Sequence, residues 1–190
     1  MNTERKQVGW GFWLRWVSAF WLWWVLASTV GLAVGGAVGG AVGFAVYEEP
    51  AGVAVVVGVA VVGAVFGASV GIAQWLVLRR QVSRAGWWVL ASTVGLAVGG
   101  VVVEAVLVGG ALLVGETLVF AVFGASVGIA QWLVLRRWQV SRAGWWVLAS
   151  TVGFAVTGVV VEAVFVSLAG YGAITGGVLV WLLRQPRPEA

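Results

Sequence analysis

The feature that most constrains this chain is a repeated pair of long apolar segments. The string WVLASTVGLAVGG begins at Trp24, returns unchanged at Trp88 and returns as WVLASTVGFAVTG at Trp146. A second string, FGASVGIAQWLVLRR, begins at Phe66 and returns letter for letter at Phe123. About 20 apolar residues suffice for one helical crossing of a bilayer, and a string that recurs indicates a copied unit. The sequence therefore predicts a membrane bundle built from repeated helical hairpins.

A weaker third copy of the second string completes the pattern. It runs from Tyr171 as YGAITGGVLVWLLRQ and has Leu179 where the other copies have glutamine. We therefore expect an all-α integral membrane protein with six transmembrane helices, arranged as three repeated hairpins. The expected spans are residues 24–46, 53–78, 87–108, 111–135, 145–166 and 169–183, with a small-residue turn at 167–172.

The expected organisation has three parts. Residues 1–23 are predicted to be a tryptophan-rich interfacial segment, residues 24–183 a six-helix transmembrane domain, and residues 184–190 a cytoplasmic tail. The repeat units within the domain are residues 24–78, 88–135 and 146–183, which span 55, 48 and 38 residues. The third hairpin is therefore expected to use a tight turn, to thin the bilayer locally or to stop short of a full crossing.

Composition excludes most enzyme classes. The 190 residues are 62% hydrophobic and 9% charged, with no histidine, no cysteine and no aspartate. The usual ligands of zinc, haem iron and iron–sulfur clusters are therefore missing, as are the usual catalytic triads. We expect a protein that is not an enzyme and that has no metal site.

Positive charge predicts the orientation. In the six-span arrangement all 11 Lys and Arg lie on one side, which by the positive-inside rule makes both termini and both basic loops cytoplasmic. The 14 tryptophans gather on the same side, either as interfacial anchors or as a face for a partner or pigment. No nucleic-acid module accompanies the charge, so membrane lipids with anionic headgroups are the expected partner and nucleic acid is not. The basic loops are either a headgroup cradle or a topology determinant only; their arginines are Arg79, Arg80, Arg84, Arg136, Arg137 and Arg142.

Glycines repeat along one face of several spans. Because lipid is as apolar as valine, helices in a membrane associate where small residues let their backbones approach. We expect these glycine zippers to pack the helices, and a pore between them is the alternative. The predicted packing positions are Gly31, Gly35, Gly39, Gly43, Gly63, Gly67, Gly71, Gly95, Gly99, Gly124 and Gly128.

A few polar residues lie at one depth below the basic loops. Gln74 is expected to hydrogen-bond to Ser92 and Thr93 on the adjacent helix, and Gln131 to Ser150 and Thr151. The third copy lacks this glutamine and has no helix after it, which favours a structural role. The alternative is that the glutamines ligate the magnesium of a chlorophyll-type pigment; a pigment of that type or a carotenoid is the one cofactor considered.

Three glutamates lie on the opposite side, where no Lys or Arg is available to them. They are Glu104, Glu116 and Glu162. They can reach the outer headgroups, can be buried and protonated, or can share a proton or cation between Glu104 and Glu116. The third option is the one that resembles a transport site.

Three segments carry a family resemblance. GFWLRW, WVLASTVG and GIAQWLVLRRQVSRAGWW resemble segments of multi-spanning repeat membrane proteins of cyanobacteria and Chloroflexi-like phototrophs. The resemblance covers nearly the whole chain. It implies an inner or photosynthetic membrane and, by analogy, association with a photosynthetic complex, and it brings no catalytic activity. The leading hypothesis is a non-catalytic scaffold or accessory subunit among other membrane-protein subunits; the rival is a small transporter or channel that uses the outer glutamates.

Overall fold

The computed structural model describes residues 10–46, 53–108, 115–159 and 164–185, which contain six α-helices and no strand. The helices α1 to α4 are long and apolar enough to cross a membrane, whereas the apolar parts of α5 and α6 are shorter. The predicted all-α fold with six helices is confirmed. The helix bounds are α1 (Trp10–Val46), α2 (Val53–Leu78), α3 (Gly86–Val108), α4 (Glu116–Arg137), α5 (Trp145–Val159) and α6 (Val164–Leu183).

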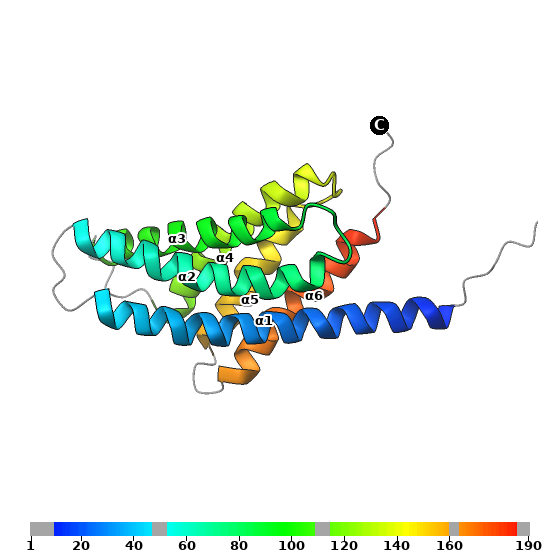
Figure 1. Ribbon diagram of the computed structural model, residues 1–190, viewed down its shortest axis with the longest axis horizontal. Coiled ribbons are helices and arrows are strands. Elements are labelled where there is room, and N and C mark those ends of the chain that lie inside the picture. The colour runs from blue at the N-terminus through cyan, green and yellow to red at the C-terminus, as the bar shows by residue number, and fades with distance from the viewer. Residues whose placement is uncertain (1–9, 47–52, 109–114, 160–163, 186–190) are drawn as a thin grey trace, which may run out of the picture.

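The helices form a closed ring in chain order. Each helix packs against its neighbours in the sequence, and α6 packs against α1 (Figure 1). The expectation that no helix follows the third copy is therefore wrong, because ring closure makes α1 the next helix after α6. One unit meets the next at three places, which we call joints: α2–α3, α4–α5 and α6–α1.

The two most informative differences from the predicted spans are at the starts of α1 and α6. The tryptophan-rich residues 10–23 are helical and continue without a break into residues 24–46, so α1 begins at Trp10. Residues 167–172 are predicted as a small-residue turn that can belong partly to the helices; they lie entirely inside α6, so the turn is wrong and the helical alternative holds. Small residues continue a helix where a neighbour packs against them, and Gly172 lies directly against Val25 of α1.

The third unit has a different register from the one predicted by the letter match, which is the sequence alignment of the segment from Tyr171 with the string from Phe66. The last glycine of each WVLASTVG string faces one residue of the following helix, in the pairs Gly31–Val70, Gly95–Val127 and Gly153–Tyr171. Tyr171 thus takes the place of Val70, whereas the letter match pairs it with Phe66. The shift is four residues, about one helical turn, and it places Leu179 level with the fully buried Leu78 rather than with a glutamine.

This register shows where the third hairpin is shortened. From its opening tryptophan to the residue level with Leu78, the third unit takes 34 residues, against 55 and 48 in the other two. Removing one turn from both helices of a hairpin removes about 7 residues, so the third hairpin lacks about two turns per helix relative to the second. In Figure 1, α6 begins well short of the end of the bundle at which α1 ends and α2 begins.

The outer surface of the ring is apolar. On α3, Leu90, Val94, Val98 and Val102 recur every four residues and are between 41% and 51% exposed. Comparable exposed stripes run along α1 and α5. Because a monomeric soluble protein rarely exposes contiguous apolar surface of this extent, these stripes and the four long apolar helices indicate a membrane-embedded protein.

Candidate functional site

Three tryptophans meet in the middle of the ring. Trp24, Trp88 and Trp146 open the three repeated strings, and none of them has any exposed surface. Their ring centroids are 6.0, 6.0 and 5.2 Å apart, and every pair is edge-to-face. This geometry is the favourable one for aromatic rings. We call these residues the indole triad; it fills the bundle interior at this level.

Two glutamines tie the triad to neighbouring helices. Gln74 Oε1 accepts a hydrogen bond of 2.8 Å from Trp88 Nε1, and Gln74 Nε2 donates one of 3.1 Å to Ser28 Oγ. Gln131 repeats both bonds, with Trp146 Nε1 at 2.8 Å and Ser92 Oγ at 2.9 Å. Each amide therefore bridges a serine of its own unit and an indole of the next unit.

The third link uses a threonine. Trp24 Nε1 donates to Thr175 Oγ1 at 3.1 Å, and Thr175 Oγ1 donates to the carbonyl oxygen of Tyr171 at 2.7 Å. Because this hydroxyl proton goes to its own helix, it is not available to Ser150. Within the described residues, Ser150 Oγ and Tyr171 Oη are buried and have no hydrogen-bond partner.

Thr175 is missed by the letter match, which puts Leu179 at the glutamine position. The spacing could have found it: Val-Gly-x-x-Gln in the first two units becomes Tyr-Gly-x-x-Thr in the third, with the polar residue three places after the glycine. The short threonine is accompanied by a large Tyr171, whose ring packs edge-to-face on Phe154 at 4.7 Å. The hydroxyl of Tyr171 faces Gln74 without reaching hydrogen-bond geometry.

The predicted partners of the glutamines are partly exchanged. Ser92 bonds to Gln131 rather than to Gln74. The hydroxyls of Thr93 and Thr151 donate to carbonyl oxygens of their own helices, at 2.9 and 2.8 Å. Gln74 and Gln131 are fully buried, and an indole N–H bonds to each amide oxygen, so a pigment could reach these oxygens only if the surrounding side chains were displaced.

Most of the glycine positions lie at helix contacts. A methyl group on Gly63 or Gly67 would collide with backbone atoms of α3, and one on Gly124 would lie 2.5 Å from Ser150 O. A methyl group on Gly39 would meet α2 at ordinary van der Waals distances, and Gly43 is buried. The remaining predicted positions also face a neighbouring helix closely: Gly31 and Gly35 face α2, Gly71 faces α3, Gly95 and Gly99 face α4, and Gly128 faces α5.

The basic end carries pairs of arginine and tryptophan. Each guanidinium carbon lies 4.9 to 5.9 Å from an indole centroid, within the range of a cation–π contact; the pairs are Arg79–Trp75, Arg136–Trp132, Arg137–Trp87 and Arg142–Trp181. Arg80 and Arg84 are exposed in the first basic loop. The indoles of Trp75 and Trp132 pack against the core of the bundle, whereas those of Trp87 and Trp181 are exposed.

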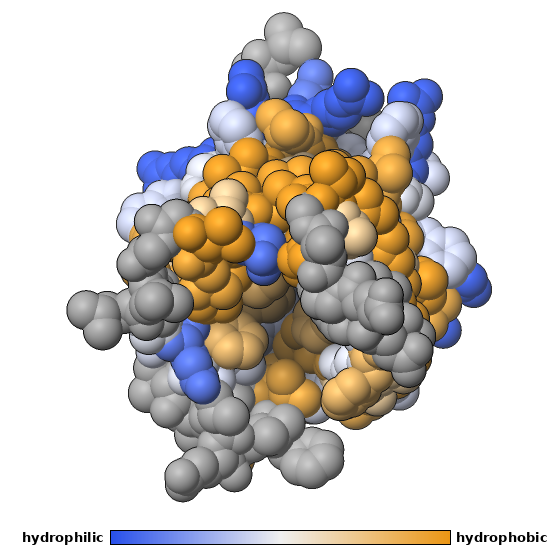
Figure 2. All heavy atoms as spheres, turned by 90° about the vertical axis from the view of Figure 1, so that its left-hand side faces the viewer, coloured by the Kyte–Doolittle hydropathy of each residue, from blue (hydrophilic) through white to orange (hydrophobic). Residues whose placement is uncertain are grey.

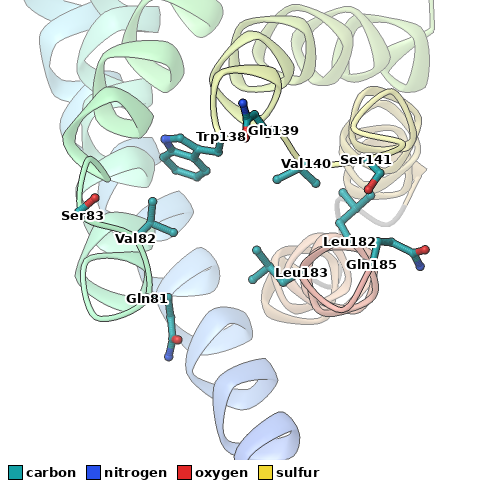
Figure 3. A pocket seen from close by; sticks show the side chains of 10 residues that line it. All are labelled: Gln81, Val82, Ser83, Trp138, Gln139, Val140, Ser141, Leu182, Leu183 and Gln185. Atoms are coloured by element: carbon teal, nitrogen blue, oxygen red, sulfur yellow. The ribbon is translucent and has the colours of Figure 1, made fainter. Parts of the chain in front are cut away.

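The second basic loop differs from the first by the extra Trp138. This ring stacks on Trp88 at 5.9 Å and 16°, so it covers the indole triad from the basic end. Gln139 and Arg142 adopt positive φ angles of 56° and 59° to accommodate it. Trp138 also lines a pocket of about 180 Å³ between the two basic loops and the end of α6 (Figure 3).

The side of the ring has an elongated groove between α1 and α2. Its volume is about 510 Å³, and its walls are apolar side chains such as Leu26, Val30 and Leu76. Arg80 and Gln81 line the groove at its basic end. The groove therefore combines apolar walls with one cationic side chain at its end.

The end of the bundle opposite the basic loops, which the predicted orientation makes the outer end, is hollow. Figure 2 shows a recess with hydrophobic walls at this end, and a cavity of about 210 Å³ lies between α2, α3, α4 and α5. Glu104 lines this cavity, whereas Glu116 is exposed at the first turn of α4 and is not part of the lining. Glu162 lies outside the described residues. Within the described part of the chain, no three His, Cys, Asp or Glu side chains form a group that could hold a metal ion.

Comparisons with protein-family models, with curated proteins and with solved structures found no match for this chain.

Proposed function

We propose that this chain is a non-catalytic integral membrane protein that binds anionic phospholipid and serves as a scaffold or accessory subunit of a larger membrane complex. In this proposal all six helices span the membrane as three repeated hairpins, and both termini and the basic loops are cytoplasmic. The membrane is an inner or photosynthetic one, as the sequence resemblance implies. The observation that carries the proposal is the groove between α1 and α2 with Arg80 at its basic end.

The groove matches the two parts of a phospholipid. Its apolar walls suit an acyl chain, and Arg80 lies where a phosphate would meet the membrane surface. A basic residue near the surface contributes about 1 kcal/mol to the binding of anionic lipid. The arginines that stack on indoles at the same end support the same surface role, since a stacked guanidinium keeps N–H groups free for phosphate oxygens.

The packed interior favours a scaffold over a channel. The indole triad, covered by Trp138, occupies the middle of the ring with no exposed indole surface among its three members. A water-filled path along the axis would have to displace these rings and break their hydrogen bonds. The rival transporter function keeps one supporting observation, which is that Glu104 lines the outer cavity.

Lipid retention tests the proposal. Purified Arg80→Gln in mild detergent should retain several-fold less phosphatidylglycerol than wild type by native mass spectrometry, because about 1 kcal/mol is about a fivefold change in affinity. Arg84→Gln removes an equal charge from the same loop outside the groove and serves as the matched control. Equal retention in both variants would contradict the groove as the lipid site.

Two further measurements test orientation and the scaffold role. A cysteine introduced by Ser83→Cys should react with membrane-impermeant thiol reagents from the cytoplasmic side, and one introduced by Glu49→Cys from the outside. Native purification should recover the protein with a larger complex, and its absorption spectrum would reveal any pigment. Flux by the wild type alone in liposomes, lost in Glu104→Gln, would instead support the transporter.

A further inference from the structure

The outer cavity is lined by phenylalanines and one carboxylate. Phe66 of α2, Phe120 and Phe123 of α4 and Phe154 of α5 contribute its aromatic walls, and Glu104 of α3 is the one charged side chain in the lining. These five residues come from four consecutive helices of the ring. The cavity is therefore a feature of the assembled bundle rather than of a single hairpin.

The floor of the cavity is closed. Leu96 and Phe154 are 1% and 3% exposed, and Tyr171 packs against Phe154 beneath them. Glu104 lies two turns farther out on the same face of α3 as Leu96, about 12 Å along the helix axis. A ligand would thus enter from the outer end and stop on the aromatic floor, with its charged part level with Glu104.

The shortened third hairpin explains why this space exists. The first two hairpins and the WVLASTVG half of the third supply walls, but α6 begins well short of this end, and none of its described side chains lines the cavity. Figure 2 shows the resulting recess from the outer end. The space is therefore built into the unequal lengths of the units.

The charge pattern selects the sign of the ligand. All 11 Lys and Arg lie in the segments assigned to the opposite end, so Glu104 has no cationic partner at the cavity. A carboxylate next to apolar walls is stabilised by a bound cation and repels an anion. Aromatic faces also attract cations, above all quaternary ammonium groups. A bare metal ion would need several oxygen ligands, whereas the described residues around the cavity offer one carboxylate, aromatic rings and aliphatic side chains.

We propose that the outer cavity is a binding site for a hydrophobic organic monocation of the quaternary ammonium type. Glu104 supplies the counter-charge, Phe120 and Phe123 flank the cationic group, and Phe66, Leu96 and Phe154 hold the apolar substituent. This site is separate from the groove between α1 and α2, so it does not depend on the lipid proposal.

Binding of benzyltrimethylammonium to the purified protein, measured by isothermal titration, tests this inference. Wild type should bind this cation, and it should not bind benzenesulfonate, an anion of similar size. Glu104→Gln should weaken binding of the cation at least tenfold, whereas Glu116→Gln, which removes an exposed carboxylate outside the cavity, should leave it unchanged. Phe123→Leu keeps the charge and the apolar wall and should weaken binding several-fold through the lost aromatic face.

Each of the following results would contradict the proposed cation-binding site. Equal binding of the cation and the anion would show partition into detergent or apolar surface. An equal loss in Glu104→Gln and Glu116→Gln would show general attraction by the acidic end. Should Glu104→Gln fail to fold, unchanged binding in Phe123→Leu would be enough to reject the aromatic site, and lipid retention in the same samples reports separately on the groove.

Discussion

The joints α2–α3 and α4–α5 are built alike, and the joint α6–α1 is built differently. At the first two, a glutamine bonds to a serine of the preceding helix and to an indole of the following helix. At the third, Thr175 reaches one indole and leaves Ser150 without a partner among the described residues. A second bond crosses the third joint, from Trp21 Nε1 to the carbonyl oxygen of Ala173 at 3.1 Å, so α6 closes onto α1 through two indoles and without a glutamine.

The glycines follow the same division. In the structural register, Leu168 of α6 stands level with Gly67 and Gly124, the glycines that touch the backbone of the next helix most closely. At that level α6 therefore has a side chain instead of a glycine, whereas four residues later Gly172 lies directly against Val25 of α1. The third joint therefore differs in its side chains: Leu168 stands in place of a glycine, and Trp21 and Trp24 supply the hydrogen bonds to α6.

The largest expected effect is from a methyl group placed in a tight joint. Gly67→Ala should destabilise the bundle by about 3 kcal/mol or more, because the new Cβ would collide with the backbone of α3 at Ser92. Unfolding in mixed detergent micelles measures this loss. The matched control is Gly40→Ala in α1, which has open space around it and should gain up to about 1 kcal/mol from helix propensity. A neutral Gly67→Ala would mean that the joints are not held by backbone contact.

Removing a glutamine should cost more than removing the threonine. Gln131→Leu loses the bonds to Trp146 and Ser92 and leaves a buried indole N–H unpaired, for a loss of roughly 2–4 kcal/mol. Thr175→Val loses the single bond to Trp24, for roughly 1–2 kcal/mol. Both are measured by the same unfolding titration. Losses of equal size would remove the distinction between the joints.

Converting the third joint to the pattern of the other two should stabilise it. The double variant Tyr171→Val and Thr175→Gln recreates the Val-Gly-x-x-Gln spacing and should supply hydrogen bonds to Ser150 and Trp24, for a gain of about 1 kcal/mol. Each single change should destabilise, because the longer glutamine beside the native tyrosine is overpacked, and valine beside the native threonine leaves a void. A double-mutant cycle measures the coupling, and additive effects of the two changes would contradict the volume exchange.

The smallest expected effect concerns the two basic loops. Gln139 holds a positive φ in the loop that contains Trp138, a conformation that costs a non-glycine residue about 1 kcal/mol. Gln139→Gly should therefore raise stability by roughly 0.5–1 kcal/mol. The matched change Gln81→Gly, in the loop without the insertion, should not stabilise. Thermal unfolding of both variants in one detergent distinguishes them.

Residue patterns predict the elements of this protein better than their connections. The repeated strings and apolar lengths are enough for six helices, and the glycine rows mark most of the faces at which helices meet. The register of α6 is not accessible in this way, because the segment Tyr171-Gly172-Ala173 resembles Phe66-Gly67-Ala68 more than the structurally equivalent Val70-Gly71-Ile72. The indole partners of Gln74 and Gln131 and the closure of α6 onto α1 depend on the ring, which no local pattern encodes.

Ring closure also sets an order of events during synthesis. The links from Trp88 to Gln74 and from Trp146 to Gln131 span 14 and 15 residues, so each can form soon after its second helix is made. The link from Trp24 to Thr175 spans 151 residues. Trp24 therefore meets its hydrogen-bond partner only after α6 has been made. Until then the ring is open, and the helices at its two ends can pair with another chain.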